Sequence, residues 1–135
     1  MAVKKYYVSW ASVERFVDEL IKFYDGAPLK GVYGLPRGGL VLAVMISHRM
    51  NIPLLMAPVE GCLIVDDISD TGESLIHYAK NSSALEKPKY NIATMYYRKG
   101  SQVVPDVFLD YKEDRWIVFP WEEKEPIGGL RPCSM

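Results

Sequence analysis

Cysteine and histidine, the residues that define many specialised sites, are scarce in this chain. It has two cysteines, Cys62 and Cys133, which are far apart and stand in no Cys-x-x-Cys or Cys/His ligand spacing. This pattern argues against a disulfide scaffold or a zinc site and fits a reduced, cytoplasmic setting. The two histidines, His48 and His77, have no acid or cysteine at the spacing of a catalytic or metal-binding pair.

An excess of charge of one sign and long apolar runs are also lacking. The formal net charge is -1, which gives no electrostatic basis for binding nucleic acid or an anionic membrane. No stretch approaches the roughly 18 consecutive apolar residues that span a bilayer. The first six residues hold no long apolar block of the kind found in signal peptides. A chain of 135 residues of this composition predicts one globular cytoplasmic domain with a substantial core.

Apolar periodicity predicts strands that alternate with helices. Strands are expected at residues 6–10 (or an extended lead-in there), 31–35, 53–56, 62–65, 90–97, 107–109 and 116–119, and helices at residues 13–24, 40–50 and 72–80. Ser9 or Ser12 is available to cap the first helix. This order predicts an α/β fold, a mainly parallel twisted sheet flanked by helices, in a single domain spanning residues 1–135. Residues 122–135 turn polar and then rich in Pro and Gly, so we expect a surface tail there.

The most informative segment joins an apolar run to a cluster of acids. Residues 62–65 are followed by Asp66 and Asp67, and then by Asp70-Thr71-Gly72-Glu73-Ser74 at the start of an amphipathic stretch. A buried strand that ends in carboxylates suits sugar hydroxyls or Mg²⁺, and a small-residue turn before a helix suits a phosphate. The segment therefore predicts a site for a phosphorylated sugar. The alternative is a helix cap beside a solvated turn.

This motif resembles the signature of the type I phosphoribosyltransferases: an apolar strand, two acids, two variable residues and Asp-Thr-Gly. Within that superfamily the chain looks most like the bacterial xanthine–guanine phosphoribosyltransferases. The resemblance extends, in order, over Tyr7-Val8-Ser9-Trp10, Leu35-Pro36-Arg37-Gly38-Gly39-Leu40-Val41, and Asp114-Arg115-Trp116-Ile117 with Pro120-Trp121. It implies a small base-binding element built from both ends of the chain. It also implies transfer of the phosphoribosyl group from phosphoribosyl pyrophosphate to a purine, with a 6-oxopurine favoured, in purine salvage.

The resemblance assigns roles to the acid-rich segment. Asp66 and Asp67 would hold the ribose hydroxyls, with Mg²⁺ as cofactor bound nearby, directly or through water. The 70–74 loop would bind the 5′-phosphate, with the side chain of Glu73, where many relatives carry Lys or Gly, pointing away from it. Asp70 would lie near N7 of the base as a general base or orienting acceptor. Capping of the following helix is the alternative for Asp70, and both roles are compatible.

The segment Pro36-Arg37-Gly38-Gly39 looks like the pyrophosphate-binding loop. Two glycines after a strand free backbone N–H groups to face an anion, and Arg37 adds a bidentate cation that would stabilise the departing pyrophosphate. The resemblance implies a cis peptide bond between Pro36 and Arg37. An ordinary strand–helix turn is the alternative.

Base recognition is expected from the later segments. Trp116 resembles the aromatic residue that stacks on the purine, and Ile117 would offer backbone hydrogen bonds to its edge; for Trp116, core packing is the alternative. A cation contacts the 6-oxo group in relatives, and because one residue is missing here against the family, either Arg98 or Lys99 can fill that role. Glu122 falls where relatives place an acid at the pocket edge, and is a weaker candidate for the Mg²⁺ site.

One expected part of the family pattern is missing. Relatives carry a long flexible loop that closes over the site and excludes water, whereas residues 57–61 are all that precede Cys62 here. Either a partner subunit in a homo-oligomer, a dimer or tetramer, or another segment of the chain would then cover the site. Otherwise catalysis is slow, or the protein is a nucleotide-binding regulatory protein without turnover. A transferase for another acceptor, a pyrimidine or an amine, is a further alternative.

Overall fold

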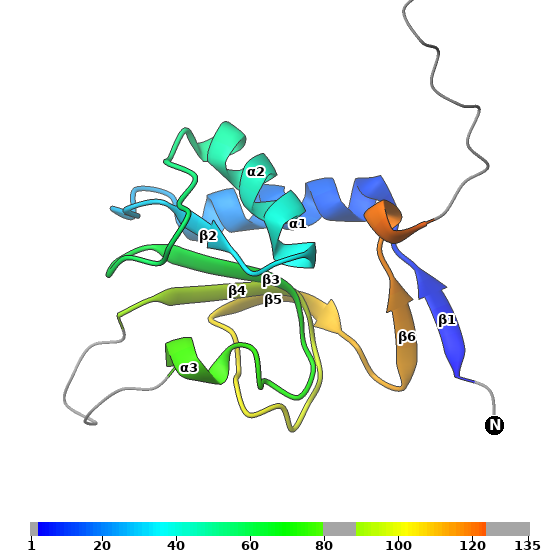
Figure 1. Cartoon of the computed structure of the whole chain (residues 1–135). Coiled ribbons are helices and arrows are strands. Elements are labelled where there is room, and N and C mark those ends of the chain that lie inside the picture. Colours follow the sequence, from blue (N-terminus) through cyan, green and yellow to red (C-terminus); the bar gives the residue numbers. More distant parts are fainter. Residues whose placement is uncertain (1–2, 80–88, 124–135) are drawn as a thin grey trace, which may run out of the picture.

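The structure, a computed structural model, describes residues 3–79 and 89–123, so most of the expected tail lies outside the described residues. Every strand pairing in it is parallel, as the sequence predicts. The main sheet has the order β2 (Val32–Gly34), β3 (Leu63–Ser69), β4 (Asn91–Tyr97), β5 (Val107–Tyr111) (Figure 1). A separate two-stranded sheet pairs β1 (Lys4–Tyr7) with β6 (Arg115–Val118).

The helices begin close to the positions that the sequence predicts, with one exception. Helix α1 (Trp10–Phe23) is capped by Ser9, whose side chain accepts a 3.1 Å hydrogen bond from the amide of Ser12. Helix α2 (Gly38–Met50) follows the glycine turn directly. Helix α3 (Ile76–Ala79) begins four residues later than expected, after a hydrogen-bonded turn. A 3-10 turn, η1 (Pro120–Glu122), includes the first residue of the expected tail. No helix in the described part of the chain is long and apolar enough to cross a membrane.

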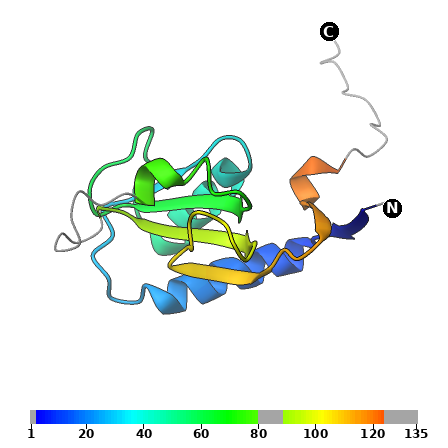
Figure 2. The same ribbon diagram turned by 90° about the horizontal axis from the view of Figure 1, so that it is seen from below.

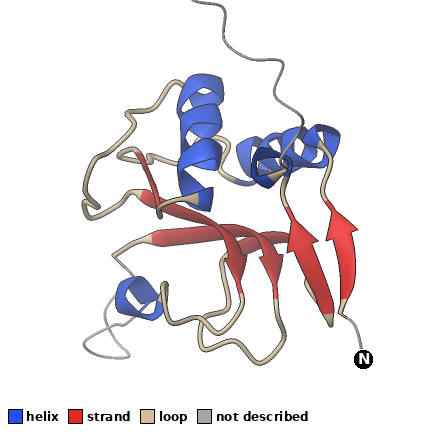
Figure 3. Ribbon diagram, turned by 45° about the vertical axis from the view of Figure 1, so that its right-hand side comes forward, coloured by secondary structure: helices blue, strands red, loops and turns tan. Residues whose placement is uncertain are grey.

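The main sheet is covered on both faces. Helices α1 and α2 lie on one face and α3 on the other (Figure 3). Along β3, Leu63 and Val65 pack in the core beneath α1 and α2, whereas Ile64 packs with Leu75 in a second core on the α3 side. Burial on both faces is typical of parallel sheets and explains the continuous apolar run before the acids.

The expected strand at residues 53–56 is reduced to a single bridge. Leu54 pairs in parallel with Val32, on the side of β2 that faces away from β3. The connection through α2 therefore returns to one side of β2, whereas the connection from β3 leads the other way to β4. Because the two connections diverge, the carboxyl ends of β2 and β3 form a topological switch point, the position at which open α/β sheets bind ligands.

The β1–β6 sheet forms an appended element at one end of the molecule (Figure 2). It is built from both ends of the chain, as the resemblance implies. Aromatic side chains join it to the main body: the Phe119 ring stacks on Trp121 with ring centroids 4.9 Å apart, and Trp121 contacts Trp10. Phe119 also packs edge-on against Tyr96 of β4.

Candidate functional site

The two adjacent acids lie within strand β3 rather than after its end. The expected strand at residues 62–65 continues to Ser69, because β4 pairs with it along that length. On the other side, β2 pairs with β3 only as far as Gly34 and Val65, and the chain then turns into α2. Asp66 and Asp67 therefore begin the part of β3 that has no neighbour on the β2 side, at the switch point between the two strands.

Glycines in the turn after β2 bring it against these acids. A Cβ atom on Gly38 would lie closer than 3.0 Å to the carboxylate of Asp67, and one on Gly39 would meet the carbonyl oxygen of Val65 as closely. Because neither residue has a side chain, the turn packs directly on β3. The peptide bond between Pro36 and Arg37 is cis, as the resemblance implies.

The backbone of this turn offers fewer donors than the sequence suggests. The amide of Gly39 donates a 2.9 Å hydrogen bond to the carbonyl of Leu35, so it does not face an anion. The amide of Gly38 has no acceptor among the described residues. Arg37 is exposed at the start of α2 and forms no salt bridge within the described part of the chain.

Both acids of the pair are partly buried, and no described cation is bonded to either of them. Burial raises the pKa of Asp66 to about 8, and the negative charge of Asp67 adds to this rise. Burial likewise raises the pKa of the Asp67 carboxyl, and the negative charge of Glu122 adds to this rise. A carboxylate pair without a compensating cation is costly, so this position favours a ligand that brings positive charge or hydroxyl donors.

A cavity of about 700 Å³ joins the glycine turn, Asp67 of the acid pair and the 3-10 turn. It is lined by Arg37, Gly38, Val41, Asp67, Trp121, Glu122 and Glu123. Glu122 accepts a 3.0 Å hydrogen bond from the amide of Phe119, which fixes the turn that brings it to the cavity. Three segments that are far apart in the sequence therefore meet here.

The acids at and beside this cavity could supply one or two ligands to Mg²⁺, but they do not form a metal site in which every ligand comes from the protein. Within residues 3–79 and 89–123, no three His, Cys, Asp or Glu side chains converge as metal ligands. Mg²⁺ is commonly held by one or two carboxylates, with waters and substrate phosphates as its other ligands. Asp66 and Asp67, whose pKa values are raised and which contact no cation in the described part of the chain, suit this mode of binding.

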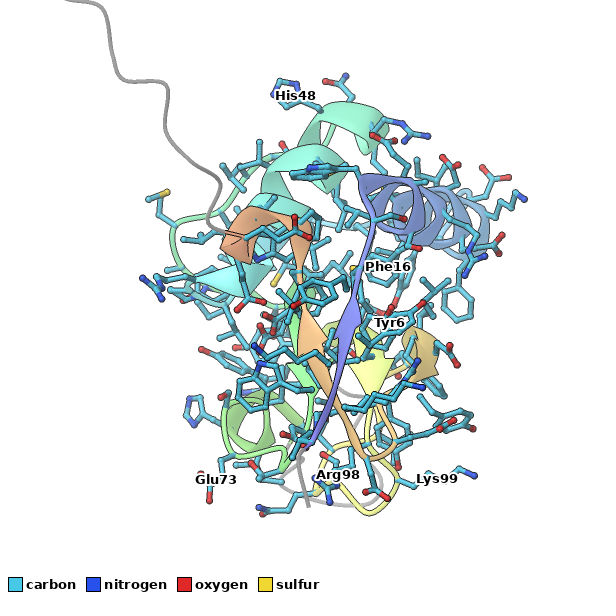
Figure 4. The ribbon with its side chains drawn as sticks, turned by 90° about the vertical axis from the view of Figure 1, so that its right-hand side faces the viewer. Tyr6, Phe16, His48, Glu73, Arg98 and Lys99 are labelled. Atoms are coloured by element: carbon cyan, nitrogen blue, oxygen red, sulfur yellow. The ribbon has the colours of Figure 1, made fainter. Side chains whose placement is uncertain are left out.

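The 70–74 loop is a turn, and the helix does not begin at Gly72 as expected. Gly72 has φ of 87°, and its carbonyl accepts a 2.8 Å hydrogen bond from the amide of Ile76. The amides of Thr71, Gly72 and Ser74 have no acceptor among the described residues, so the loop itself, not a helix end, offers donors to an anion. Glu73 is exposed and its side chain points away from the ribbon (Figure 4).

Asp70 lies between two cations at the carboxyl edge of the main sheet. Its Oδ1 is 3.5 Å from Arg98, and its Oδ2 is 3.8 Å from Nζ of Lys112. The structure thus separates the two basic candidates: Arg98 contacts Asp70, whereas Lys99 lies over the ring of Tyr111, 4.7 Å from its centroid. Arg98 and Lys99 share one end of the molecule with Glu73, opposite His48 (Figure 4).

Trp116 and Ile117 lie on β6 in different environments. Trp116 is 60% exposed, which rules out the core position considered for it, whereas the Ile117 side chain is buried. The carbonyl of Val118 accepts a 2.8 Å hydrogen bond from the amide of Val8 in the chain after β1. Because backbone groups of successive strand residues point to opposite sides, the N–H and C=O of Ile117 point to the open edge of β6.

Sequence reasoning missed two parts of this region. Lys112 was not a candidate, because the strand before it was expected to end at residue 109 and no periodicity marks it. Ser69 was also missed: its hydroxyl donates to the carbonyl of Val103 (2.8 Å) and lies 2.8 Å from the Ser101 hydroxyl. These bonds hold the segment after Arg98 against the end of β3. The position of Lys112 depends on the register of three strands, and that of Ser69 on the path of the loop between β4 and β5.

The class of protein is defined by comparison of this fold with solved structures. A purine phosphoribosyltransferase from Pyrococcus horikoshii superposes with a TM-score of 0.73 and is 32% identical over 93% of this chain and 99% of its own. A xanthine-guanine-hypoxanthine phosphoribosyltransferase from Helicobacter pylori shares the fold, with a TM-score of 0.67 and 19% identity over 87% of this chain and 93% of its own. The α/β fold of this chain, with its parallel sheet flanked by helices, therefore matches that of solved phosphoribosyltransferases.

Sequence comparison gives the same answer. The xanthine-guanine phosphoribosyltransferase of Idiomarina loihiensis is 29% identical over 157 aligned positions, covering 93% of this chain and 94% of the relative. No family model matches the chain. The chain belongs to the purine phosphoribosyltransferases of the type I family, which are glycosyltransferases of purine salvage. The resemblance and the α/β fold predicted from the sequence are thereby confirmed.

Proposed function

We propose that this protein transfers the 5-phosphoribosyl group from Mg²⁺-bound phosphoribosyl pyrophosphate to a 6-oxopurine and releases pyrophosphate. The observation that supports this most is the contact between Gly38 and Asp67. It puts a glycine turn, whose arginine has no salt-bridge partner within residues 3–79 and 89–123, against an acid pair that no cation of the same residues contacts. Pyrophosphate on one side and a ribose with Mg²⁺ on the other satisfy both halves of this arrangement.

The acid pair holds the sugar end of the substrate. The carboxylates of Asp66 and Asp67 accept hydrogen bonds from the 2′- and 3′-hydroxyls of the ribose and supply protein ligands to Mg²⁺, with Glu122 as a further acid at the cavity edge. Mg²⁺ supplies positive charge that stabilises the pyrophosphate as it leaves. The partial burial of the pair makes this charge compensation stronger than it would be in water.

Pyrophosphate and the 5′-phosphate bind at the two turns. Arg37 donates a bidentate pair of hydrogen bonds to the pyrophosphate, and the free amide of Gly38 donates another. The loop amides of Thr71, Gly72 and Ser74, with the hydroxyls of Thr71 and Ser74, bind the 5′-phosphate. Catalysis then consists of positioning the reactants and stabilising a leaving anion, without a nucleophilic side chain.

The base binds where the strand ends face β6. Asp70 accepts a hydrogen bond from the imidazole edge of the purine and takes up its proton as the new bond to the ribose forms. Arg98, which is half-exposed beside Asp70, donates to the 6-oxo group. The exposed ring of Trp116 stacks on the base, and the outward-facing backbone of Ile117 bonds its edge.

The test is to offer hypoxanthine, guanine, xanthine and adenine separately with phosphoribosyl pyrophosphate and Mg²⁺, and to identify the nucleoside monophosphate formed by mass spectrometry. Formation of nucleotide from the 6-oxopurines and not from adenine supports the proposal. Formation from adenine alone refutes the 6-oxopurine assignment. Omission of Mg²⁺ serves as the control and is expected to abolish the product.

A second function, binding of phosphoribosyl pyrophosphate or a nucleotide without turnover, is favoured by one observation. The short segment before β3 is tied to the start of the strands: the amide of Gly61 donates to the carbonyl of Lys89 (2.7 Å), and the amide of Lys30 donates to the carbonyl of Gly61 (3.1 Å). The segment at residues 57–61 therefore does not lie over the carboxyl ends of β2 and β3. It cannot exclude water from the site there, and exclusion of water is needed for turnover more than for binding. Binding measured by calorimetry together with no product from any acceptor, a pyrimidine included, would establish this second function.

We also propose that the protein is a homo-oligomer. Large apolar side chains stand exposed on α2 and on the segment after it, among them Leu40 (45%), Val44 (42%) and Met56 (90%). Burial of these side chains by a second copy would remove an unfavourable apolar surface. Light scattering is expected to give a mass of two or four chains, and a single-chain mass at assay concentration would refute this.

A further inference from the structure

Lys112 is a buried cation that the roles above do not use. It follows β5 directly, only 8% of its surface is exposed, and its Nζ lies 3.8 Å from Oδ2 of Asp70. A lysine is seldom buried to this extent unless it is paired with an opposite charge. Among the described residues, Asp70 is the one acid within salt-bridge distance of it.

Strand register brings Lys112 to this position. Ser69 of β3 pairs with Tyr97 of β4, and Tyr97 pairs with Tyr111 of β5. The next residues extend the ladder by one step. The amide of Arg98 donates a hydrogen bond to the backbone carbonyl of Ser69 (2.9 Å), and the amide of Lys112 donates one to the backbone carbonyl of Tyr97 (3.0 Å).

Asp70, Arg98 and Lys112 are therefore equivalent positions at the ends of three adjacent parallel strands. This alignment makes the contact a consequence of the fold rather than of a flexible surface side chain.

The backbone of Lys112 is held in place from the other side. Arg115 donates from Nε to the carbonyl of Lys112 (3.2 Å) and from its terminal nitrogen to the carbonyl of Tyr111 (2.7 Å). The guanidinium of Arg115 also lies over the ring of Tyr6 in β1, 4.3 Å from its centroid. The appended β1–β6 element thus fixes the turn that carries Lys112.

The two cations on Asp70 differ in how easily they can leave it. The side chain of Arg98 is 50% exposed, whereas that of Lys112 is 10% exposed. An exposed ion pair exchanges with water or ligand at little cost, but separating a buried ammonium from its partner leaves an uncompensated charge. One oxygen of Asp70 is therefore held by a permanent partner and the other by a replaceable one.

We infer that Lys112 is a positioning residue: it fixes the carboxylate of Asp70 at the carboxyl edge of the sheet while Arg98 moves to the oxo group of the bound purine. This inference rests on the proposed function. Among the described residues, Asp70 pairs with Arg98 and Lys112. If Lys112 were absent and Arg98 contacted the base, no cation of these residues would hold the Asp70 carboxylate, and it would be free to rotate. Lys112 itself does not touch the substrate and acts only through Asp70.

A double-mutant cycle tests this inference, with Asp70→Asn, Lys112→Met and the double variant compared with the wild type. Methionine keeps most of the apolar stem of lysine and removes the charge. Lys112→Arg restores the charge, and Lys22→Met, on an exposed lysine of α1 with a 76% exposed side chain, is the matched control. Each variant is measured for kcat and KM with the base and with phosphoribosyl pyrophosphate, and for its unfolding equilibrium in urea.

Lys112→Met is expected to lower kcat/KM for the base by about 10- to 50-fold, because a misplaced base-contacting group costs transition-state binding. The KM for phosphoribosyl pyrophosphate is expected to change by less than about 3-fold, and in the Asp70→Asn background the same change is expected to have almost no effect, since interacting residues are not additive. Lys112→Arg is expected to recover most of the activity. Equal losses from Lys112→Met in both backgrounds would overturn the inference, because they would mean that Lys112 acts independently of Asp70.

The unfolding cycle separates this inference from the proposed function. Coupling of Asp70 and Lys112 in the urea unfolding equilibrium, about 3- to 10-fold for a partly buried pair, shows that the pair forms whatever the reaction. If that coupling is absent, the pair itself is refuted. If it is present and the wild type converts no base, the proposed function fails and the positioning role for it fails as well. Coupling in unfolding without coupling in kinetics overturns the positioning role alone.

Discussion

The contact between the glycine turn and the acid pair predicts a sharp difference between two neighbouring glycine substitutions. In Gly38→Ala, the new methyl group would overlap the carboxylate of Asp67; in Gly39→Ala, it would overlap the backbone carbonyl of Val65. A carboxylate at the end of a side chain can rotate away, whereas the backbone of a central strand cannot. Gly38→Ala is therefore expected to impair function and Gly39→Ala to impair folding.

The size of each effect follows from these contacts. Real Cβ atoms essentially never approach other atoms below 3.0 Å, so the Asp67 carboxylate must move in Gly38→Ala. The required movement is on the order of 1 Å, a misplacement that typically costs about 100-fold in rate. Gly39→Ala forces α2 away from β3 and is expected to cost about 2–4 kcal/mol of unfolding free energy, in the range of an overpacked core.

The assay is kcat/KM for phosphoribosyl pyrophosphate together with urea unfolding of the same preparations. We expect Gly38→Ala to lose about 100-fold in kcat/KM with little change in unfolding, because helix α2 tolerates alanine well. Gly26→Ala is unsuitable as a control because φ at Gly26 is 76°, so a partly buried serine of α1, Ser12→Ala, serves instead. Wild-type activity in Gly38→Ala would refute the placement of Asp67 against the turn.

Three further predictions follow from the site. Burial raises the pKa of Asp66 to about 8 from an ordinary value of 3.8, so the folded state binds the proton of this carboxyl more tightly than the unfolded state does. The ligand-free protein is therefore expected to lose stability as the pH rises from about 4 to 8. Asp66→Asn is expected to remove most of that loss, on the order of 4 kcal/mol by urea unfolding at pH 8 relative to pH 5, and an unchanged pH slope would contradict the effect of burial on this carboxyl. Trp116→Ala is expected to leave the melting temperature within a few degrees, because the ring is 60% exposed, and to raise the KM for the base by about 10-fold or more through lost stacking; a large fall in melting temperature with unchanged KM would show a structural role instead. Arg37→Lys keeps the charge but loses the bidentate fork, so calorimetry is expected to show phosphoribosyl pyrophosphate binding weakened about 10-fold, and full affinity in this variant would argue against a bidentate contact.

The regular part of the fold could be predicted from the sequence because its signals are local. The apolar stripe of α1 and the buried run of residues 62–65 each determine an element by their own spacing, and both are present. The extension of β3 through Asp66 and Asp67 could not be predicted in this way. Two adjacent acids are typical of a turn, and here pairing with β4 overrides that local preference.

Parts of the site depend on contacts between distant segments, and the sequence carries no local signal for them. Arg98 and Lys99 both follow the end of β4, and of these two only Arg98 reaches Asp70, whereas Lys99 lies over the ring of Tyr111. Lys112 depends on the register of three strands. The exposure of Trp116 was one of two open alternatives, because an aromatic residue in a short strand packs in a core as readily as it stacks on a ligand.

The most direct test of the central claim is base-dependent release of pyrophosphate by the wild type and by Asp66→Asn/Asp67→Asn, with phosphoribosyl pyrophosphate, Mg²⁺ and a 6-oxopurine. Removal of both carboxylates takes away the acid pair proposed to hold the ribose and Mg²⁺ but relieves an unfavourable buried charge pair, so the variant is expected to fold at least as stably. We expect rapid release by the wild type and a loss of at least about 1,000-fold in the folded variant. Equal release by both proteins would contradict the role of the acid pair in catalysis.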